Sequence, residues 1–291
     1  MRFIAMVKCR IFPNIGSHDR SRLQLPYRSL WPPALGTRLP IRLDLMKVCI
    51  IYVCPVSALG PEHFSLACRF VASIHHNPAG YDYELVVASN GGPPDLETQL
   101  LFAPFNARFI ERSDEGWDIG AFIEVSHKIE CEMVVCFGGP GYVRRAGWLN
   151  RMVYAWKKHG PGFYGSLSTY EVSPHINTTG FWCMPELLRA YPYKVVTRED
   201  RYNFEHRERA CWRTAARMGL PVKFVTWLKE YDWPHWRDEP NIYRRGNQSA
   251  CLTYFRHSDS FDNADEMTRI RMSQLSDRLT DPCFMSKKVL I

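Results

Sequence analysis

Residues Met133–Tyr142 read MVVCFGGPGY, and this stretch decides how the fold is interpreted. Its first five residues are apolar, and such a run is typical of a strand buried on both faces of a parallel sheet. The run ends in Gly138-Gly139-Pro140-Gly141. A strand that ends in glycines often lets a ligand approach the main chain closely. The sequence therefore predicts a central strand with a candidate binding turn at its end.

Strand-like and helix-like segments alternate on both sides of this stretch. We expect strands at 47–53, 83–88, 107–111, 133–137, 164–169, 179–184 and 222–227, and helices at 62–76, 116–128, 148–158 and 205–218. Such alternation predicts an α/β fold, a Rossmann-type sandwich with a mainly parallel central sheet flanked by helices. Ligands of such sheets bind outside the carboxyl ends of the strands, here at 55–57, 89–92 and 138–141.

The chain ends differ in composition from the middle. Residues 1–45 hold eight Lys or Arg and two acids, a net of +6, so the remaining residues carry +1 of the total of +7. We interpret 1–45 as a leader that is either disordered or not translated, with the true start of the protein at Met46. The alternative is a transit peptide, which the segment resembles weakly. The folded domain is expected at 46–261, followed by a polar tail at 262–291 that holds one surface helix.

Charge and cysteine content exclude several classes of protein. A nearly neutral domain gives no basic groove for nucleic acid. The ten cysteines form no CxxC pair, which favours free thiols in a reducing compartment. No apolar run is long enough to span a membrane, so we expect a cytoplasmic protein with at most peripheral membrane contact.

The sequence lacks the familiar catalytic motifs, and four polar segments are the remaining candidates for a functional site. There is no Walker loop, no GxGxxG and no GxSxG, and no metal site is recognised. The four segments are DEGWDIGA at 114–121, SPHINTTG at 173–180, RYNFEHR at 201–207 and YVRR at 142–145. Each has a plainer alternative: a helix cap, a polar turn, an ordinary helix-start glutamate and surface arginines.

Taken in order, these segments resemble a GT-A type glycosyltransferase of the inverting nucleotide-sugar transferase kind, from about Met46 to Asp259. The matching pieces are YVCPV at 52–56, SNGG at 89–92, Asp118 within Gly116–Ala121, GWL at 147–149, and Phe204-Glu205-His206 leading to Gly219. The family's central strand ends in a DxD motif, whose carboxylates hold the Mn²⁺ or Mg²⁺ of the donor diphosphate. Here that position is Gly138-Gly139, and His206 replaces the family's second acid.

The resemblance implies which residues form the site. It implies Glu205, with His206, as the catalytic pair. It implies a donor site made by Pro55, Val56, Asn90, Gly91, Asp118, Gly138 and Gly139. It implies contacts to the diphosphate or the acceptor from Arg144, Arg145, His175, Asn177, Thr178 and Arg201. No metal or other cofactor is expected, unless Mn or Mg ligands lie elsewhere.

The resemblance implies a transferase that moves a sugar from a nucleotide-sugar donor to a glycan or lipid-linked acceptor, as in polysaccharide biosynthesis. The resemblance implies that transfer would invert the anomeric configuration, and the missing DxD acids imply that transfer would be metal-independent. Two alternatives stay open: a catalytically silent relative that binds a glycan or a protein partner, and another nucleotide-using enzyme such as a nucleotidyltransferase. The second would also need metal-binding acids at strand ends, and the sequence shows few.

Overall fold

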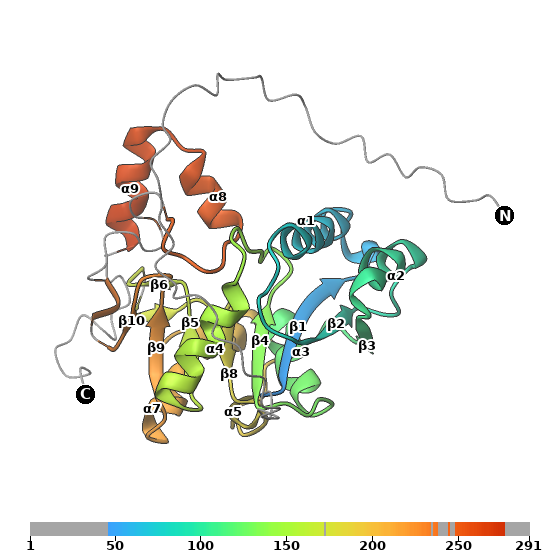
Figure 1. The fold of residues 1–291 in the computed structure, drawn as a ribbon, viewed down its shortest axis with the longest axis horizontal. Helices are drawn as coiled ribbons and strands as arrows, with labels where there is room; N and C mark the ends of the chain where they lie inside the picture. Colours follow the sequence, from blue (N-terminus) through green and yellow to red (C-terminus); the bar gives the residue numbers. More distant parts are fainter. Residues whose placement is uncertain (1–45, 172, 234, 238–243, 245–247, 277–291) are drawn as a thin grey trace, which may run out of the picture. The chain divides into compact units, whose positions relative to one another are not determined.

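The computed structural model describes residues 46–276, except for 172, 234, 238–243 and 245–247 (Figure 1). The expected leader at 1–45 and the part of the expected tail beyond 276 lie outside the described residues. The described residues belong to one compact unit. Among the described residues, no helix is both long and apolar enough to cross a membrane.

One sheet of eight strands organises the described chain, in the order β10-β9-β5-β8-β4-β1-β2-β3. The strands are β1 (Val48–Pro55), β2 (Glu84–Asn90), β3 (Arg108–Arg112), β4 (Met133–Phe137), β5 (Phe163–Gly165), β8 (Phe181–Cys183), β9 (Val222–Val225) and β10 (Glu230–Tyr231). The four strands β4, β1, β2 and β3 are parallel, whereas β8 runs antiparallel to both β4 and β5. The short strands β6 (Ser168–Thr169) and β7 (His175–Ile176) pair separately.

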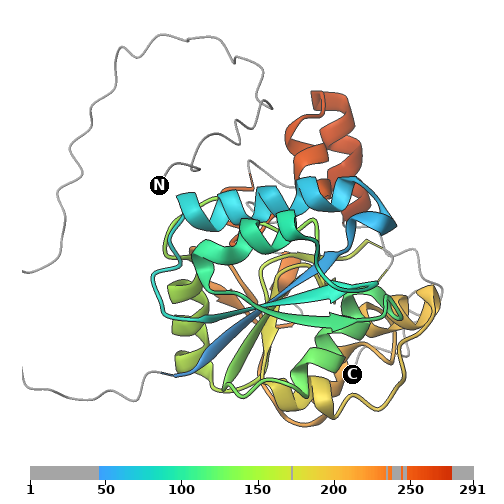
Figure 2. The same ribbon diagram turned by 90° about the vertical axis from the view of Figure 1, so that its right-hand side faces the viewer.

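Helices cover both faces of this sheet, as Figure 2 shows. The helices are α1 (Glu62–His76), α2 (Leu96–Phe102), α3 (Trp117–Ser126), α4 (Trp148–His159), α5 (Pro185–Arg189), α6 (Arg198–Glu205), α7 (Cys211–Arg217), α8 (Arg256–Asp262) and α9 (Glu266–Ser276). Strand β1 alternates between two cores: Ile51 packs in the core that holds Phe122 of α3, and Ile50 packs in the core that holds Phe70 of α1. The predicted α/β fold, with a mostly parallel sheet between helices, is confirmed.

Two element predictions are wrong. The helix expected at 205–218 is two helices, because α6 ends at Glu205 and α7 begins at Cys211. Arg207 lies between them with φ +56, a left-handed conformation that an α-helix cannot contain. The strand expected at 164–169 divides into β5 and β6, which belong to different sheets. Glu205 therefore ends a helix instead of beginning one.

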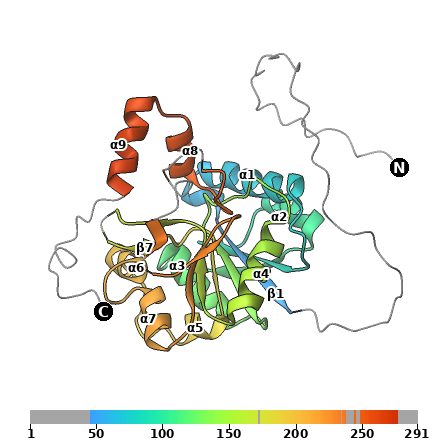
Figure 3. The same cartoon turned by 60° about the vertical axis from the view of Figure 1, so that its left-hand side comes forward.

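The boundary expected between 261 and 262 falls inside α8. Helices α8 and α9 stand together beside α1 in Figures 1 and 3, and α9 is the helix expected in the tail. The hydroxyl of Thr169 and the amide of Tyr170 both donate to the carbonyl of Ser276, the last residue of α9. Residues 262–276 are thus packed onto the domain.

Candidate functional site

The order of the parallel strands places a crevice between β1 and β4. From β1 the chain continues outward to β2 and β3, and then returns to add β4 on the other side of β1. In open α/β sheets, ligands bind at this kind of switch point, outside the carboxyl ends of the two strands. Pro55 ends β1 and the glycine turn Gly138–Gly141 follows β4, so the sequence-predicted Pro55 and Gly139 lie at the switch point.

The glycine turn is in contact with the end of β1. A Cβ atom at Gly139 would lie 3.4 Å from the carbonyl oxygen of Val53 and 4.0 Å from Cδ of Pro55. The hydroxyl of buried Tyr52 donates to the carbonyl oxygen of Gly139 over 2.9 Å. Strand β1 therefore fixes the turn through main-chain packing and one side-chain hydrogen bond.

The start of α3 carries Asp118 to the same place. Gly116 precedes the helix with φ +72, and a Cβ atom there would lie 2.4 Å from the carbonyl oxygen of Val195, so this position requires glycine. Asn90 donates from Nδ2 to Asp114 and to the carbonyl of Trp117, and is fully buried. Asn90 thus positions the first turn of α3 through hydrogen bonds. Because its side chain is buried, it does not reach the surface where a nucleotide sugar was expected to bind.

Asp118 faces the glycine turn and holds an arginine there. A Cβ atom at Gly138 would lie 3.2 Å from Oδ2 of Asp118. Arg201 of α6 donates from Nε to Oδ1 over 2.6 Å and from Nη2 to Oδ2 over 3.0 Å. The side chain of Arg201 is 47% exposed, and the Asp118 hydrogen bond raises its pKa. A guanidinium thus stands beside Gly138, where the resemblance leads one to expect a metal.

Glu205 lies one helical turn after Arg201, on the same face of α6. The helix begins with a capping box between Thr197 and Asp200 and ends where His206 adopts an extended conformation. Oε1 of Glu205 accepts from the amide of Thr178 over 3.0 Å. Its side chain is 17% exposed, so the carboxylate is partly shielded and still reachable.

Two histidines flank the Glu205 carboxylate. Nε2 of His175 lies 3.9 Å from Oε1, and Nε2 of His206 lies 3.9 Å from Oε2. Nδ1 of His175 is 2.7 Å from the carbonyl oxygen of Ser173. Because a carbonyl can only accept, Nδ1 of His175 is the donor in this contact, and Nε2 is the ring nitrogen that faces Glu205.

His206 is held in its neutral form. Its Nδ1 lies 3.0 Å from the hydroxyl of Ser173, and its ring stacks on Tyr202. Burial, followed by the charges of His175 and Arg207, lowers the pKa of His206 to about 2. His206 is therefore uncharged at neutral pH. It cannot replace the negative charge of the second acid in the family's catalytic pair.

Several expected residues have other contacts. Arg144 donates to Asp259, Asp262 and the hydroxyl of Tyr142, and Arg145 stacks over Trp227 at 4.3 Å. These contacts lead toward α8 and Trp227, not toward the Asp118–Arg201 pair, and they do not form the expected diphosphate clamp. The Asn177 side chain accepts from the amide of Thr179, as in a polar turn. Val56 and Gly91 border the ends of β1 and β2, with φ +91 at Gly91.

The turn after β4 does not fit a divalent metal ion. It holds no acid, and both oxygens of the nearby Asp118 are occupied by Arg201. Within the described part of the chain, no three His, Cys, Asp or Glu side chains are arranged to hold a metal. The described side chains provide two guanidinium groups here: that of Arg201, held by Asp118, and that of Arg69, which donates to the carbonyl oxygen of Pro140.

A separate polar cavity lies near the same helix. Its volume is about 490 Å³, and it is lined by Thr197, Glu199, Asp200, Asn203, Arg207, Glu208 and Arg209. Arg201 and Glu205 are not among the lining residues, since α6 turns them to another face. We assign this cavity no part in the site at the β1–β4 crevice.

Comparison with known proteins gives a likeness in structure alone. No family model matches the chain, and no curated protein matches it. The mannosyltransferase PcManGT from Pyrobaculum calidifontis, solved with GDP-Man and Mn²⁺, has a TM-score of 0.48 and 12% identity, over 79% of this chain and 70% of that chain. S. aureus TarS has a TM-score of 0.41 and 13% identity, over 56% of this chain and 34% of that chain.

A shorter TarS structure, residues 1–349 in complex with UDP, has a TM-score of 0.40 and 13% identity, over 56% of each chain. The present chain thus spans about a third of the longer TarS structure and just over half of the shorter one. With TM-scores below 0.5, these likenesses carry no argument about activity.

Sequence reasoning missed two residues that shape the turn. Tyr52 lies within an expected strand, and a tyrosine in such an apolar run could have signalled a buried hydroxyl with a partner. Arg69 of α1 donates from Nη2 to the carbonyl oxygen of Pro140 over 2.8 Å. Nothing in the sequence near Arg69 signals this contact, because its partners lie 71 and 190 residues away.

Proposed function

We propose that the protein is a glycosyltransferase that moves a sugar from a nucleotide-sugar donor to a glycan or lipid-linked acceptor. The observation that carries this proposal is the Asp118–Arg201 pair beside Gly138, at the switch point between β1 and β4. An anion at this point meets a glycine main chain, a fixed guanidinium and, one helical turn further, the Glu205 carboxylate. This combination suits a diphosphate leaving group next to a general base.

The donor lies across the crevice in this proposal. Pro55 and Val56 border the nucleobase at the end of β1, and Gly138 and Gly139 let the diphosphate approach the main chain. Arg201 offers a planar, permanently charged group, which pairs with phosphate oxygens in a bidentate fashion. Asp118 orients Arg201 and shares it with the donor.

Transfer is a single displacement with inversion. Glu205 removes the proton from the acceptor hydroxyl, and that oxygen forms a bond to the anomeric carbon. The bond between the anomeric carbon and the diphosphate breaks, and the diphosphate leaves with the electron pair. Arg201 stabilises the charge that develops on the diphosphate. The amide of Thr178 orients Glu205 by donating to Oε1, so Oε2 is the oxygen that receives the proton.

Transfer is metal-independent in this proposal. Because Arg201 is charged at every pH at which the protein folds, it neutralises the diphosphate without a bound ion. A carboxylate in place of Gly138 would repel both Asp118 and the donor. The missing acid in the turn is therefore consistent with a cationic side chain that takes the role of a metal.

A catalytically silent protein that binds a glycan or a protein partner is the second candidate. The observation that favours it is that His206 is neutral and that Arg201 already has a carboxylate partner. Such a protein would retain ligand binding without turnover. The cytoplasm and the biosynthesis of a polysaccharide remain our expectations for location and role.

The proposal is tested by release of nucleoside diphosphate. The full chain is incubated with UDP-, GDP- and dTDP-sugars, with and without a panel of glycan and lipid-linked acceptors, in the presence of EDTA. We expect one donor to give release that an acceptor stimulates and that EDTA leaves unchanged. Binding of a donor without release in any mixture would favour the silent protein instead.

A further inference from the structure

Helix α8 reaches the glycine turn through one arginine of α1. Arg69 donates from Nη2 to the carbonyl oxygen of Pro140 over 2.8 Å, and from Nη1 to Oδ2 of Asp259 in α8 over 2.6 Å. The two donors of one guanidinium thus join α8 to the turn. The Arg69 side chain is 34% exposed and that of Asp259 is 27% exposed, so water only partly screens this pair.

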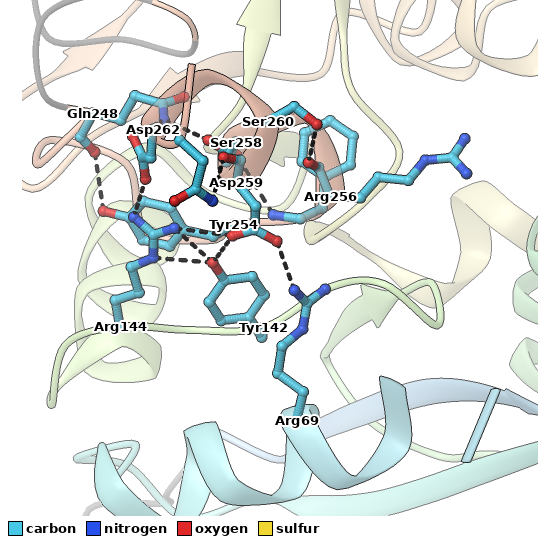
Figure 4. Close-up of polar contacts among 12 residues, drawn as sticks. Arg69, Tyr142, Arg144, Gln248, Tyr254, Arg256, Ser258, Asp259, Ser260 and Asp262 are labelled. Atoms are coloured by element: carbon cyan, nitrogen blue, oxygen red, sulfur yellow. Dashed lines mark hydrogen bonds and ion pairs between the residues drawn. The ribbon is translucent and has the colours of Figure 1, made fainter. Parts of the chain in front are cut away.

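Asp259 is the centre of this contact, as Figure 4 shows. Its Oδ1 accepts from the hydroxyl of Tyr142 and from Nη2 of Arg144. Arg69 also lies over the ring of Tyr142, 4.3 Å from its centre. Each of these partners lies within five residues of the glycine turn or belongs to α1. The carboxylate of Asp259 therefore binds side chains from both the segment after the turn and α1.

The main chain reinforces the same connection. Tyr142, which directly follows the turn, exchanges two backbone hydrogen bonds with Tyr254, which precedes α8, over 2.9 and 2.8 Å. Gln248 donates to Asp262 and to the carbonyl of Ser258, which adds two hydrogen bonds to α8. Helix α8 is therefore connected to the end of the turn by main-chain hydrogen bonds as well as by Arg69.

We propose that Arg69 and Asp259 are positioning residues of the donor site, which hold the glycine turn in the shape that receives the diphosphate. This inference rests on the function proposed above. It makes α8, which the sequence suggested to be the edge of a polar tail, a working part of the site. In this proposal Arg69 acts on the turn through the carbonyl oxygen of Pro140, and Asp259 acts through Arg69.

The geometry requires arginine at position 69. One planar guanidinium donates to Pro140 and Asp259 at the same time, and its fork keeps the two acceptors at a fixed separation. A lysine ammonium has three donors on one nitrogen, and we expect it to pair with Asp259 instead of bridging both acceptors as the guanidinium fork does. Lysine at this position is therefore expected to behave like a neutral residue toward the turn, although it keeps the charge.

The test measures the turn itself, without any ligand. The amide of Gly141 donates to the carbonyl of Gly138 over 2.8 Å inside the turn, and the amide of Gly180 donates to Cys136 over 2.9 Å outside it. The full chain is labelled with ¹⁵N-glycine, and hydrogen exchange is followed at both amides. In Arg69→Met and Arg69→Lys we expect Gly141 to exchange about tenfold faster, the effect of losing one charge-assisted hydrogen bond, and Gly180 to stay unchanged.

Two further variants complete the test. Asp259→Asn keeps the shape of the side chain, removes its charge, and is expected to accelerate Gly141 exchange in the same direction. Arg108→Met is the matched control, because Arg108 forms an exposed ion pair with Glu84 at the far edge of the sheet. The control is expected to leave both amides unchanged.

Binding of the donor is measured on the same proteins. UDP, GDP and dTDP are titrated, and the nucleotide that binds the wild type is expected to bind the Arg69 variants about tenfold more weakly, with Arg108→Met unaffected. Unchanged exchange at Gly141 would overturn the positioning role, whatever the affinities. If the wild type binds no nucleotide, the proposed function fails, while the exchange rates still decide whether Arg69 and Asp259 hold the turn.

Discussion

Asp118 and Arg201 join α3 to α6 at the carboxyl end of β4 through two hydrogen bonds of 2.6 and 3.0 Å. Asp118 holds the positively charged guanidinium of Arg201 beside Gly138, and the turn itself contains no acid. In our proposal this fixed guanidinium does for a departing diphosphate what a divalent ion would otherwise do.

Loss of the Arg201 charge should weaken donor binding. In Arg201→Met we expect the dissociation constant of the preferred nucleoside diphosphate to rise about tenfold to a hundredfold, the usual effect of losing hydrogen bonds to a charged group. Isothermal titration calorimetry measures the change. The control is Arg217→Met, on α7, whose side chain is 54% exposed. Equal losses in both variants would mean that Arg201 has no specific role.

Removal of the Glu205 charge should stop transfer and spare binding. Glutamine at position 205 keeps an oxygen that can accept from Thr178, but it cannot take a proton. We expect kcat to fall by about 10² to 10⁴ while the donor dissociation constant changes little. The control is Glu208→Gln, an exposed acid three residues further along the chain. A Glu205→Gln protein with full turnover would show that the base is another group.

The neutral state of His206 should make stability depend on pH. Its pKa is lowered from 6.5 to about 2 in the folded protein, so only the unfolded chain binds a proton as the pH falls below about 6.5. Folding should therefore lose about 2 kcal/mol between pH 7 and pH 5 through this one group. Urea unfolding of the wild type and of His206→Asn at both pH values measures it.

The groups that face His206 are His175, Glu205 and Arg207, and all three are present in both proteins. The difference between the two pH dependences therefore isolates His206. Identical losses in the wild type and His206→Asn would show that the buried ring accepts a proton in the folded state.

An acid at the end of β4 should harm this site instead of creating a metal site. In Gly138→Asp the new Cβ atom would lie 3.2 Å from Oδ2 of Asp118, and the new charge would compete for Arg201. We expect the free energy of unfolding to fall by about 1–3 kcal/mol, as for a poorly compensated charge in a packed region. Gly138→Ala, which adds the Cβ atom without the charge, should lose less. A gain of Mn²⁺-dependent stability in Gly138→Asp would contradict this account.

The sequence predicts the sheet and its site edge well, because local periodicity carries that information. The apolar runs at 47–53 and 133–137 form β1 and β4, and the site residues Pro55 and Gly139 follow from the rule that ligands bind at strand ends. Asp118 and Arg201 are hydrogen-bonded to each other although they come from separate segments, and Glu205 follows Arg201 by one helical turn; their roles stay predictions.

Long-range contacts explain what the sequence did not predict. The break between α6 and α7 depends on the left-handed φ of Arg207, and an arginine gives no sequence signal for that conformation. Asn90 was expected to touch the donor, but it is buried beneath α3. Arg144 was expected to clamp a diphosphate, but Asp259 and Asp262, more than 110 residues later, bind it. Pairings at such distances follow from the fold and leave no local pattern.

Binding of a nucleoside diphosphate in the presence of EDTA tests the central claim most directly. Thermal unfolding of the full chain is followed with UDP, GDP and dTDP, each with EDTA and each with Mn²⁺. We predict that one nucleotide stabilises the protein equally in both conditions, by about 2.7 kcal/mol at a hundred times its dissociation constant. Stabilisation that requires Mn²⁺, or none with any nucleotide, would contradict a donor site in which Arg201 takes the place of the metal.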